Sequence, residues 1–306
     1  MGTPLKQVSF VGLQTMPEVK PGDDIARLIL ESCLREHVSL EERNVIVITS
    51  KIVSKAENRI VNVQNVVPTR RARALSKLTG KDPIEVEMIL RESTGVSAVI
   101  PIKKIRQHYP TIFENLSSNR EAMDETVSKV PSLLVTTTKQ GVLATDAGLD
   151  YSNNPQDTAS LLPSNPNASA IKIRNDLERL TGLILAIVIT DTEISFTNVY
   201  GSTEISIGYS GIRPVSNNFG SKDRFDRKKF GGADVIVDEI ACAAGLLTGQ
   251  TSEGIPVVIL KGLEYEKSDD ASRLVFPQDA LRKGIWWTVI STLRARLLSR
   301  IMELFV

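Results

Sequence analysis

Residues 45–59 read VIVITSKIVSKAENR, an apolar and β-branched run that ends at Thr49 and is followed at once by Ser50, Lys51 and Lys55. A short apolar run of this kind predicts a buried β-strand. One interpretation of the polar residues is that the strand leads into a solvated turn. The other is that the strand end presents cations to an anionic ligand.

Further apolar runs of strand length follow along the chain, with helical patterns between them. The strand-like runs are VSFVGL at 8–13, SLLVTTT at 132–138, ILAIVITDT at 184–192, ISIGYSG at 205–211 and PVVILKG at 256–262. The helical patterns are GDDIARLILESCLREH at 22–37, the region 66–95, and DVIVDEIACAAGLLTG at 234–249, which Gly249 ends. Residues 105–130 are polar and are predicted to be irregular. Because strands and helices do not alternate strictly, the sequence predicts an α+β fold.

Composition excludes several classes of protein. With 306 residues and 42% hydrophobic content, the chain can form one large domain or two ordinary ones. A net charge of +1 gives no reason to expect a nucleic-acid partner or a membrane surface. The N-terminus lacks a signal-peptide pattern, and no apolar run is long enough to span a bilayer, so we expect a cytoplasmic protein. The chain has two cysteines and two histidines, which are Cys33, Cys242, His37 and His108. Their spacing indicates neither a metal site nor a nucleophile triad.

Two stretches place carboxylates where a hard cation could bind. In TDAGLDYSNNP, residues 145–155, small residues keep the backbone tight, and Asp150 and Asn153 can point together from a turn. In VITDTEI, residues 188–194, an apolar run ends in Asp191 and Thr192. Mg²⁺ and Mn²⁺ suit one or two carboxylates together with phosphate and water. Both stretches also have structural interpretations, because Asx residues stabilise turns and Asp often caps a helix.

The stretch LLTGQTSEGIPVVILKG, residues 246–262, places two glycines around a short polar loop that leads into an apolar strand. It contains G-x-x-x-x-G, but Ile255 and Pro256 stand where a P-loop has Lys and Ser or Thr. It is therefore not a Walker A motif, although its backbone N–H groups could still surround a nucleotide. No G-x-G-x-x-G dinucleotide pattern occurs in the chain. Cationic strand ends, two separated aspartates and this loop together indicate a nucleotide and a divalent metal.

Taken in order, these stretches resemble one family. GDDIARLI, SKIVSKAENRIV, DAGLDYSN, LLPSNPNASAIKIR, ITDT and TGQTSEGIPVVILKGL follow the order and style of the coenzyme F420-0:L-glutamate ligases over residues 8–264. The resemblance implies a GTP-dependent ligase that adds L-glutamate through γ-linkages to the deazaflavin coenzyme F420-0. It also implies two Mg²⁺ or Mn²⁺ sites, help from a monovalent cation such as K⁺, and an intertwined homodimer. The implied fold is α+β, with mixed or antiparallel sheets and flanking helices.

The resemblance also assigns roles to particular residues. The catalytic residues would be Lys55, Asp150 and Asp191, with the first metal held by Asp150 and Asp191 and the second by Thr192 and Gln250. The nucleotide would contact Met16, Pro17, Glu18, Val19, Ser50, Lys51, Lys55, Asn153, Thr248, Gly249, Gln250, Thr251, Ser252, Glu253, Gly254 and Ile255. A carboxylate reacts with an amine at a useful rate only after phosphorylation gives it a good leaving group. Phosphoryl transfer needs charge neutralisation and alignment more than a protein nucleophile, which agrees with this assignment.

The chain departs from the family pattern near the expected acceptor site. After Asp191 and Thr192 the family carries arginines suited to an anionic acceptor, whereas residues 193–208 read EISFTNVYGSTEISIG and contain no arginine. Asp146 replaces an expected Asn and is predicted to make the pocket more negative. Gln250 stands where Glu is also found. A ligase for a different carboxylate acceptor and a non-catalytic nucleotide-binding paralogue are therefore alternatives.

The sequence also predicts a division of the chain. Residues 1–264 are predicted to form the catalytic domain, with an insertion at 108–129, and residues 265–306 a helical C-terminal extension. We expect one stripe of that extension to pack against the core or a partner subunit rather than on a membrane. The stripe consists of Trp286, Ile290, Leu293, Leu297, Ile301 and Leu304.

Overall fold

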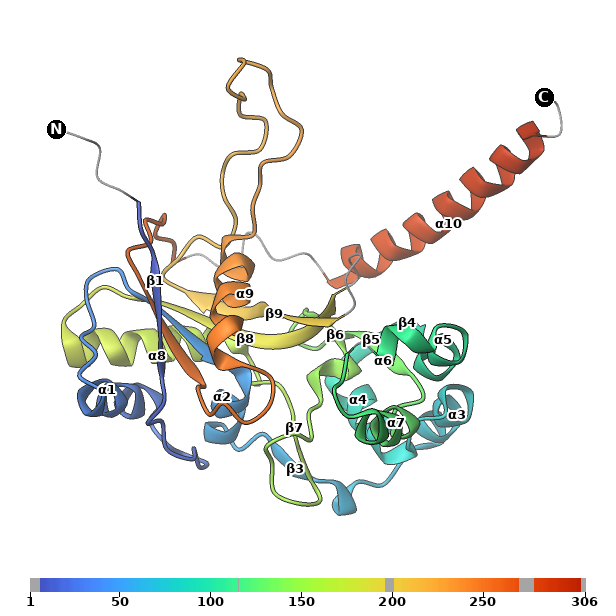
Figure 1. Cartoon of the computed structure of the whole chain (residues 1–306), viewed down its shortest axis with the longest axis horizontal. Helices are drawn as coiled ribbons and strands as arrows, with labels where there is room; N and C mark the ends of the chain where they lie inside the picture. Colours follow the sequence, from blue (N-terminus) through green and yellow to red (C-terminus); the bar gives the residue numbers. More distant parts are fainter. Residues whose placement is uncertain (1–5, 115, 196–200, 270–277, 304–306) are drawn as a thin grey trace. The chain divides into compact units, whose positions relative to one another are not determined.

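The computed structural model describes residues 6–114, 116–195, 201–269 and 278–303. The chain divides into two compact units (Figure 1). The first unit draws on Met1–Val67, Thr111–Ser118 and Gly148–Leu274, and the second on Pro68–Pro110, Asn119–Ala147 and Val275–Val306. Both units contain helices as well as strands, which confirms the predicted α+β class.

A mixed five-stranded sheet forms the centre of the first unit (Figure 1). Its strand order is β1 (Ser9–Leu13), β10 (Val257–Lys261), β2 (Val45–Thr49), β8 (Ala186–Ser195) and β9 (Gly201–Ser210). All neighbouring strands are antiparallel except β2 and β8, which pair in parallel with Thr49 opposite Thr190. Because these two strands run in the same direction, the residue that follows Thr49 at the end of β2 lies beside the residue that follows Thr190 within β8.

The central strands are buried on both faces. Alternation along β2 sends Val47 to one face and Ile48 to the other, and both are at most 1% exposed. Helix α9 (Ile236–Thr248) packs on the face that holds Val47, where Ile240 and Ala244 join the same hydrophobic cluster. Helix α8 (Pro166–Thr181) packs against β8 and β9, and helix α1 (Ile25–Arg35) contacts α8. The continuous apolar runs of the sequence are therefore strands covered by helices.

Short elements complete the first unit. Helix α2 (Ser50–Ala56) follows β2 directly, and a two-stranded ladder joins β3 (Ile60–Asn62) to β7 (Thr158–Ser160), with the 3₁₀ turn η1 (Val63–Asn65) after β3. Helix α8 was not among the helices predicted from the sequence. Its limits nevertheless follow ordinary rules, because Asn165 caps it, Pro166 occupies its first turn and Gly182 ends it at a φ of 74°.

The second unit is built around a three-stranded antiparallel sheet of order β4-β5-β6. Its elements are α3 (Arg70–Thr79), α4 (Pro83–Glu92), β4 (Ser93–Ile100), α5 (Ile102–His108), α7 (Arg120–Lys129), β5 (Leu133–Thr138) and β6 (Leu143–Thr145). Helices α3 and α4 confirm the helical region predicted at 66–95, although β4 begins before its end. Two short elements, α6 (Pro110–Glu114) and the 3₁₀ turn η2 (Asp146–Gly148), lie where the ranges of the two units meet.

The prediction that residues 105–130 are irregular is wrong, because α5, α6 and α7 occupy most of this range. Helix α7 lacks a buried face, but Asn119 caps it by accepting a hydrogen bond from Ala122 N at 3.1 Å. Lys129 pairs with Glu125 one turn earlier, at 2.6 Å. Caps and pairs of this kind stabilise a helix that shows little hydrophobic periodicity in its sequence. That residues 108–129 are an insertion stays a prediction, as does the division at 264.

The C-terminal range contains helix α10 (Gln278–Glu303). Trp286, Leu293 and Leu297 of the predicted stripe are 62%, 61% and 62% exposed, and packing of the stripe on the core stays a prediction. Contact with a partner subunit stays a prediction, and Leu304 lies outside the described residues. Among the helices of the described ranges, none has both the length and the apolar character that crossing a membrane requires.

Candidate functional site

The parallel pairing of β2 with β8 brings a hydroxyl and a carboxylate together where β2 ends, although β8 continues past its carboxylate to Ser195. Ser50 is the first residue after β2, and Asp191 follows Thr190, the residue paired with Thr49. Ser50 Oγ donates a hydrogen bond to Asp191 Oδ1 at 2.7 Å. The two buried apolar strands therefore fix the position of both polar groups.

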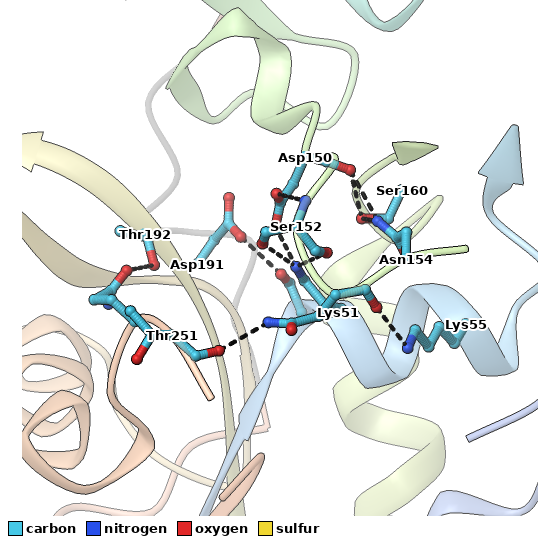
Figure 2. Close-up of polar contacts among 12 residues, drawn as sticks. Lys51, Lys55, Asp150, Ser152, Asn154, Ser160, Asp191, Thr192 and Thr251 are labelled. Atoms are coloured by element: carbon cyan, nitrogen blue, oxygen red, sulfur yellow. Dashed lines mark hydrogen bonds and ion pairs between the residues drawn. The ribbon is translucent and has the colours of Figure 1, made fainter. Parts of the chain in front are cut away.

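The lysines of α2 reach toward a turn that follows β6 and η2 (Figure 2). Lys51 and Lys55 are one helical turn apart and share a face of the helix. Lys51 Nζ donates to Ser152 O at 2.6 Å and to Ser152 Oγ at 2.7 Å. Lys55 Nζ donates to Asn153 O at 3.0 Å and pairs with the carboxylate of Glu18. Helix α2 follows the strand and Lys55 is only 9% exposed, so the solvated-turn interpretation of residues 45–59 is wrong. That these lysines meet an anionic ligand stays a prediction.

Asp150 organises the turn that receives these lysines (Figure 2). Its backbone bridges to Ser160 of β7, which anchors the turn. Its carboxylate accepts hydrogen bonds from Ser152 N at 2.7 Å and Ser152 Oγ at 3.0 Å, and it pairs with Lys51. Asn154 Nδ2 donates to the backbone oxygen of Asp150 at 3.0 Å. The structural interpretation of this Asx turn is therefore correct, and it leaves the Asp150 carboxylate beside a cation.

The glycine-containing loop after α9 forms the opposite wall. Gly249 has φ 63° and ψ −173°, a conformation that is essentially restricted to glycine. The carboxylate of Glu253 accepts hydrogen bonds from Thr251 N at 2.9 Å and from Thr251 Oγ1 at 3.2 Å, which closes the loop on itself. Asn153 Nδ2 donates to Thr251 O at 3.1 Å and so joins this loop to the Asp150 turn.

The site is strongly acidic around Asp191. Burial raises the pKa of the Asp191 carboxyl from its ordinary 3.8 to about 7, and the hydrogen bond from Ser50 opposes this rise. The negative charges of Glu193, Glu204 and Asp150 raise the pKa further. A carboxylate in such surroundings gains from any cation that binds beside it.

The chemistry of these donors fits a divalent cation. Thr190 and Thr248 also line the site, and the hydroxyl of each is buried without a hydrogen-bond partner. Across the described part of the chain, no three His, Cys, Asp or Glu side chains gather closely enough to hold a metal by themselves. A cation at Asp191 would therefore share its shell with hydroxyl, amide, phosphate and water oxygens, as Mg²⁺ does in nucleotide sites.

Most of these groups line one pocket of about 430 Å³ in the first unit. Pockets of roughly 300–1,000 Å³ are typical of small-molecule sites. Every residue that the sequence analysis assigned to the nucleotide or to a metal lines this pocket: Met16, Pro17, Glu18, Val19, Ser50, Lys51, Lys55, Asp150, Asn153, Asp191, Thr192, Thr248, Gly249, Gln250, Thr251, Ser252, Glu253, Gly254 and Ile255. The structure thus brings the candidate residues together, and their individual roles stay predictions.

Other lining residues were missed from the sequence, namely Thr49, Ile52, Ser152, Thr190, Glu204 and Pro256. The most polar of them, Glu204, lies on β9 opposite Thr192. A β-hairpin between ITDTEIS (189–195) and GSTEIS (201–206) in the observed register places Glu204 opposite Thr192. The length of the connection between the two runs does not give this register, so the sequence alone does not identify Glu204.

Two expectations concern the acceptor side, one at Asp146 and one in the segment 193–203. Asp146 does not line the pocket, so the prediction that it makes the pocket more negative is wrong. It is buried in the second unit, where it accepts hydrogen bonds from Lys81 Nζ at 2.9 Å and from Leu134 N at 2.8 Å. In the segment 193–203, residues 196–200 lie outside the described residues, and the parts on either side continue β8 and β9.

Comparison with known proteins gives consistent matches. A family model described as F420-0:Gamma-glutamyl ligase matches residues 14–262. The coenzyme F420:L-glutamate ligase of Methanosarcina mazei is 34% identical over 262 residues, which cover 86% of this chain and 89% of that protein. The coenzyme F420:L-glutamate ligase of Methanothermobacter thermautotrophicus is 32% identical over 259 residues, which cover 84% of this chain and 90% of that protein.

Proposed function

The chain belongs to the F420-0:gamma-glutamyl ligase family, and we propose that it joins L-glutamate to coenzyme F420-0 through a γ-glutamyl amide bond at the expense of GTP. One observation carries the proposal beyond family membership. The residues that would bind nucleotide and metal come from segments far apart in the sequence, and they all line a single pocket. The pocket also combines lysines with carboxylates, as a metal–nucleotide complex requires.

The proposed reaction proceeds in two steps. The acceptor carboxylate takes the γ-phosphoryl group of GTP, which releases GDP and forms an acyl phosphate. The amine of L-glutamate then attacks the acyl carbon, inorganic phosphate leaves, and the nitrogen loses a proton as the amide forms. The protein has to align these groups and neutralise their charge, which needs no nucleophilic side chain.

Residues of this chain can supply both requirements. Lys51 and Lys55 would turn from the oxygens of Ser152 and Asn153 to the phosphate oxygens, over a short distance because α2 already aims them into the pocket. The backbone N–H groups of residues 248–255 would bound the nucleotide on the other side. Asp150 and Asp191 would hold one Mg²⁺ or Mn²⁺, and Thr192 and Gln250 a second. When bound, these ions neutralise phosphate charge.

A direct assay tests the proposal. Purified protein supplied with GTP, Mn²⁺, L-glutamate and F420-0 should release GDP and give a product heavier by one or more glutamyl units in mass spectrometry. ATP in place of GTP should support less turnover, and Asp191→Asn should abolish product formation. GTP hydrolysis that does not depend on the acceptor, or a product without added glutamate, would overturn the proposal.

A second candidate is a related ligase that acts on a different carboxylate. It is favoured by the residues 193–208, where arginines expected for an anionic acceptor are missing. A panel of other carboxylic acids in the same GDP-release assay distinguishes the two. A non-catalytic nucleotide-binding paralogue is disfavoured, because a scaffold has no need for Asp150 and Asp191 at one pocket.

The remaining properties of the family are proposals for this chain as well. We propose a cytoplasmic, intertwined homodimer with the family's mixed-sheet fold, activated by K⁺ and without a nucleic-acid or membrane partner. The exposed apolar stripe of α10 supports the homodimer, because a partner subunit would remove that surface from water. Size-exclusion chromatography with light scattering tests the dimer.

A further inference from the structure

Glu204 is an acidic residue of the pocket to which the proposed reaction assigns no role. It lies on β9 directly opposite Thr192 of β8, and it is only 6% exposed. A buried carboxylate is costly unless hydrogen bonds compensate for the lost water. The partners of Glu204 therefore indicate what its position achieves.

Two of its partners are the residues proposed to hold the second cation. Thr192 Oγ1 donates a hydrogen bond to Glu204 Oε1 at 2.7 Å. Gln250 Nε2 donates to the same oxygen at 2.9 Å. Thr192 Oγ1 also lies 3.2 Å from Gln250 Oε1, a longer contact that competes for the same hydroxyl proton and loses it to the closer, charged oxygen of Glu204. Glu204 is thus the common acceptor for both candidate ligands.

The carboxylate selects which end of the Gln250 amide faces the pocket. The two ends of an amide have nearly the same shape, so hydrogen-bond partners decide its orientation. An ionised carboxylate can only accept, so it engages Nε2 and leaves Oε1 for a cation. It also takes the hydroxyl proton of Thr192, so the lone pairs of that oxygen remain available.

Helix α9 is shaped around this carboxylate. A Cβ at Gly245 would lie 2.8 Å from Glu204 Cγ, so glycine leaves the room that the Glu204 side chain occupies. Cys242 Sγ donates to the backbone oxygen of Glu204 at 3.1 Å, one turn from Gly245. Helix and strand together hold Glu204 in one place.

We propose that Glu204 is a positioning residue, which presents Gln250 Oε1 and Thr192 Oγ1 to the second divalent cation. The inference rests on the proposed function, which assigns these two side chains to a cation. Residues that orient metal ligands typically contribute about 10- to 100-fold in metal affinity. Glu204 acts through its two partners, so its effect depends on geometry and not only on its charge.

The test is Mn²⁺ binding to the full chain in the presence of GDP, without F420-0 or glutamate, followed by the electron paramagnetic resonance signal of free Mn²⁺. Glu204→Gln and Glu204→Asp should each weaken Mn²⁺ binding at the second site about 10- to 100-fold. Glu204→Gln can donate as well as accept, and Glu204→Asp keeps the charge but shortens the reach. Glu193→Gln is the matched control, because Glu193 also raises the pKa of Asp191 but does not line the pocket, and its effect should be smaller.

The exchange variant E204Q/Q250E separates geometry from charge. It keeps one amide and one carboxylate in the pair, with the hydrogen bond reversed, so it should recover most of the affinity lost in E204Q. Thermal unfolding of each variant tests whether it folds. If E204Q does not fold, E204D and the exchange variant still test the positioning role.

The outcomes separate this inference from the proposed ligase activity. Wild-type affinity in E204D, or equal losses in E204Q and E193Q, would overturn the positioning role. Wild-type protein that binds no Mn²⁺ in the presence of GDP would overturn it as well. Mn²⁺ binding that depends on Glu204, in a protein that turns over no F420-0, would count against the proposed acceptor and leave the positioning role standing.

Discussion

Ser50 Oγ lies 2.7 Å from Asp191 Oδ1 and connects the end of β2 to the middle of the parallel strand β8. This hydrogen bond is the contact that lowers the pKa of Asp191 against the effect of burial and of neighbouring acids. It therefore favours the charged form of a carboxylate that a cation would use.

Replacing Ser50 by alanine should weaken divalent cation binding. A hydrogen bond to a charged group contributes about 1.5–3 kcal/mol, so Ser50→Ala should reduce Mn²⁺ affinity at pH 7 by about tenfold or more. Ser50→Thr keeps the hydroxyl and is the control. Mn²⁺ titration by electron paramagnetic resonance measures both, and equal affinities for Ser50→Ala and wild type would contradict this role of the hydroxyl.

The raised pKa of Asp191 gives a signed pH effect on stability. The folded protein holds this proton more tightly than the unfolded chain, whose carboxyl titrates near its ordinary 3.8. The stabilising contribution is therefore complete below that pH and is lost as pH rises through about 7. In metal-free protein, the Tm of Asp191→Asn should exceed that of wild type by more at pH 8 than at pH 5. A Tm difference that stays constant between these pH values would argue against the raised pKa.

Lys55 should be required for nucleotide affinity. It is nearly buried at the pocket wall, and a phosphate would replace Glu18 and Asn153 O as its partners. Loss of a charged hydrogen bond should reduce affinity for GTP about 10- to 100-fold in Lys55→Met. Lys20→Met is the matched control, since Lys20 is exposed and does not line the pocket. Calorimetry with GTP and Mg²⁺ measures both variants, and similar losses would show that the effect is one of overall charge.

Gly249→Ala should distort the loop after α9. Its backbone angles are essentially open to glycine alone, and forcing another residue there costs about 1–3 kcal/mol. The new Cβ would also lie 2.1 Å from Glu253 Cδ, so that carboxylate would leave Thr251. We expect a lower Tm and weaker GTP binding. Gly201→Ala has open space and should match wild type in both, whereas wild-type GTP affinity in Gly249→Ala would show that the loop does not bound the nucleotide.

Much of the first unit could be predicted from its apolar runs. The strands around Val47 and Ile48 are continuous because both faces of the sheet are covered, and the sequence shows this directly. The pairing of β2 with β8 could not be derived, since strand order depends on contacts between segments about 140 residues apart, as the Ser50–Asp191 contact is. The resemblance to a family supplied the grouping of pocket residues that the chain's own patterns left open.

Predictions from the sequence were wrong or incomplete where contacts between particular residues, and not a repeat of apolar residues, determine the structure. Helix α7 is stabilised by the cap at Asn119 and by the pair Lys129–Glu125, and neither produces an apolar stripe. Asp146 was placed at the pocket because it stands where the family pattern has Asn, but its carboxylate is bound by Lys81 in the second unit. Glu204 was missed because only the register between β8 and β9 places it opposite Thr192, and the sequence does not give that register.

The ion pair between Lys51 and Asp150 joins the group predicted to meet a phosphate to the group predicted to meet a metal. A cation that takes Asp150 frees Lys51 for an anion, and an anion that takes Lys51 frees Asp150 for a cation. Either ligand that binds alone bears the full free-energy cost of breaking this ion pair, whereas two ligands that bind together share that cost. Divalent metal and nucleotide should therefore bind with positive cooperativity, each raising the affinity of the other by the same factor. The pocket would then bind the metal–nucleotide complex more tightly than it binds either component alone.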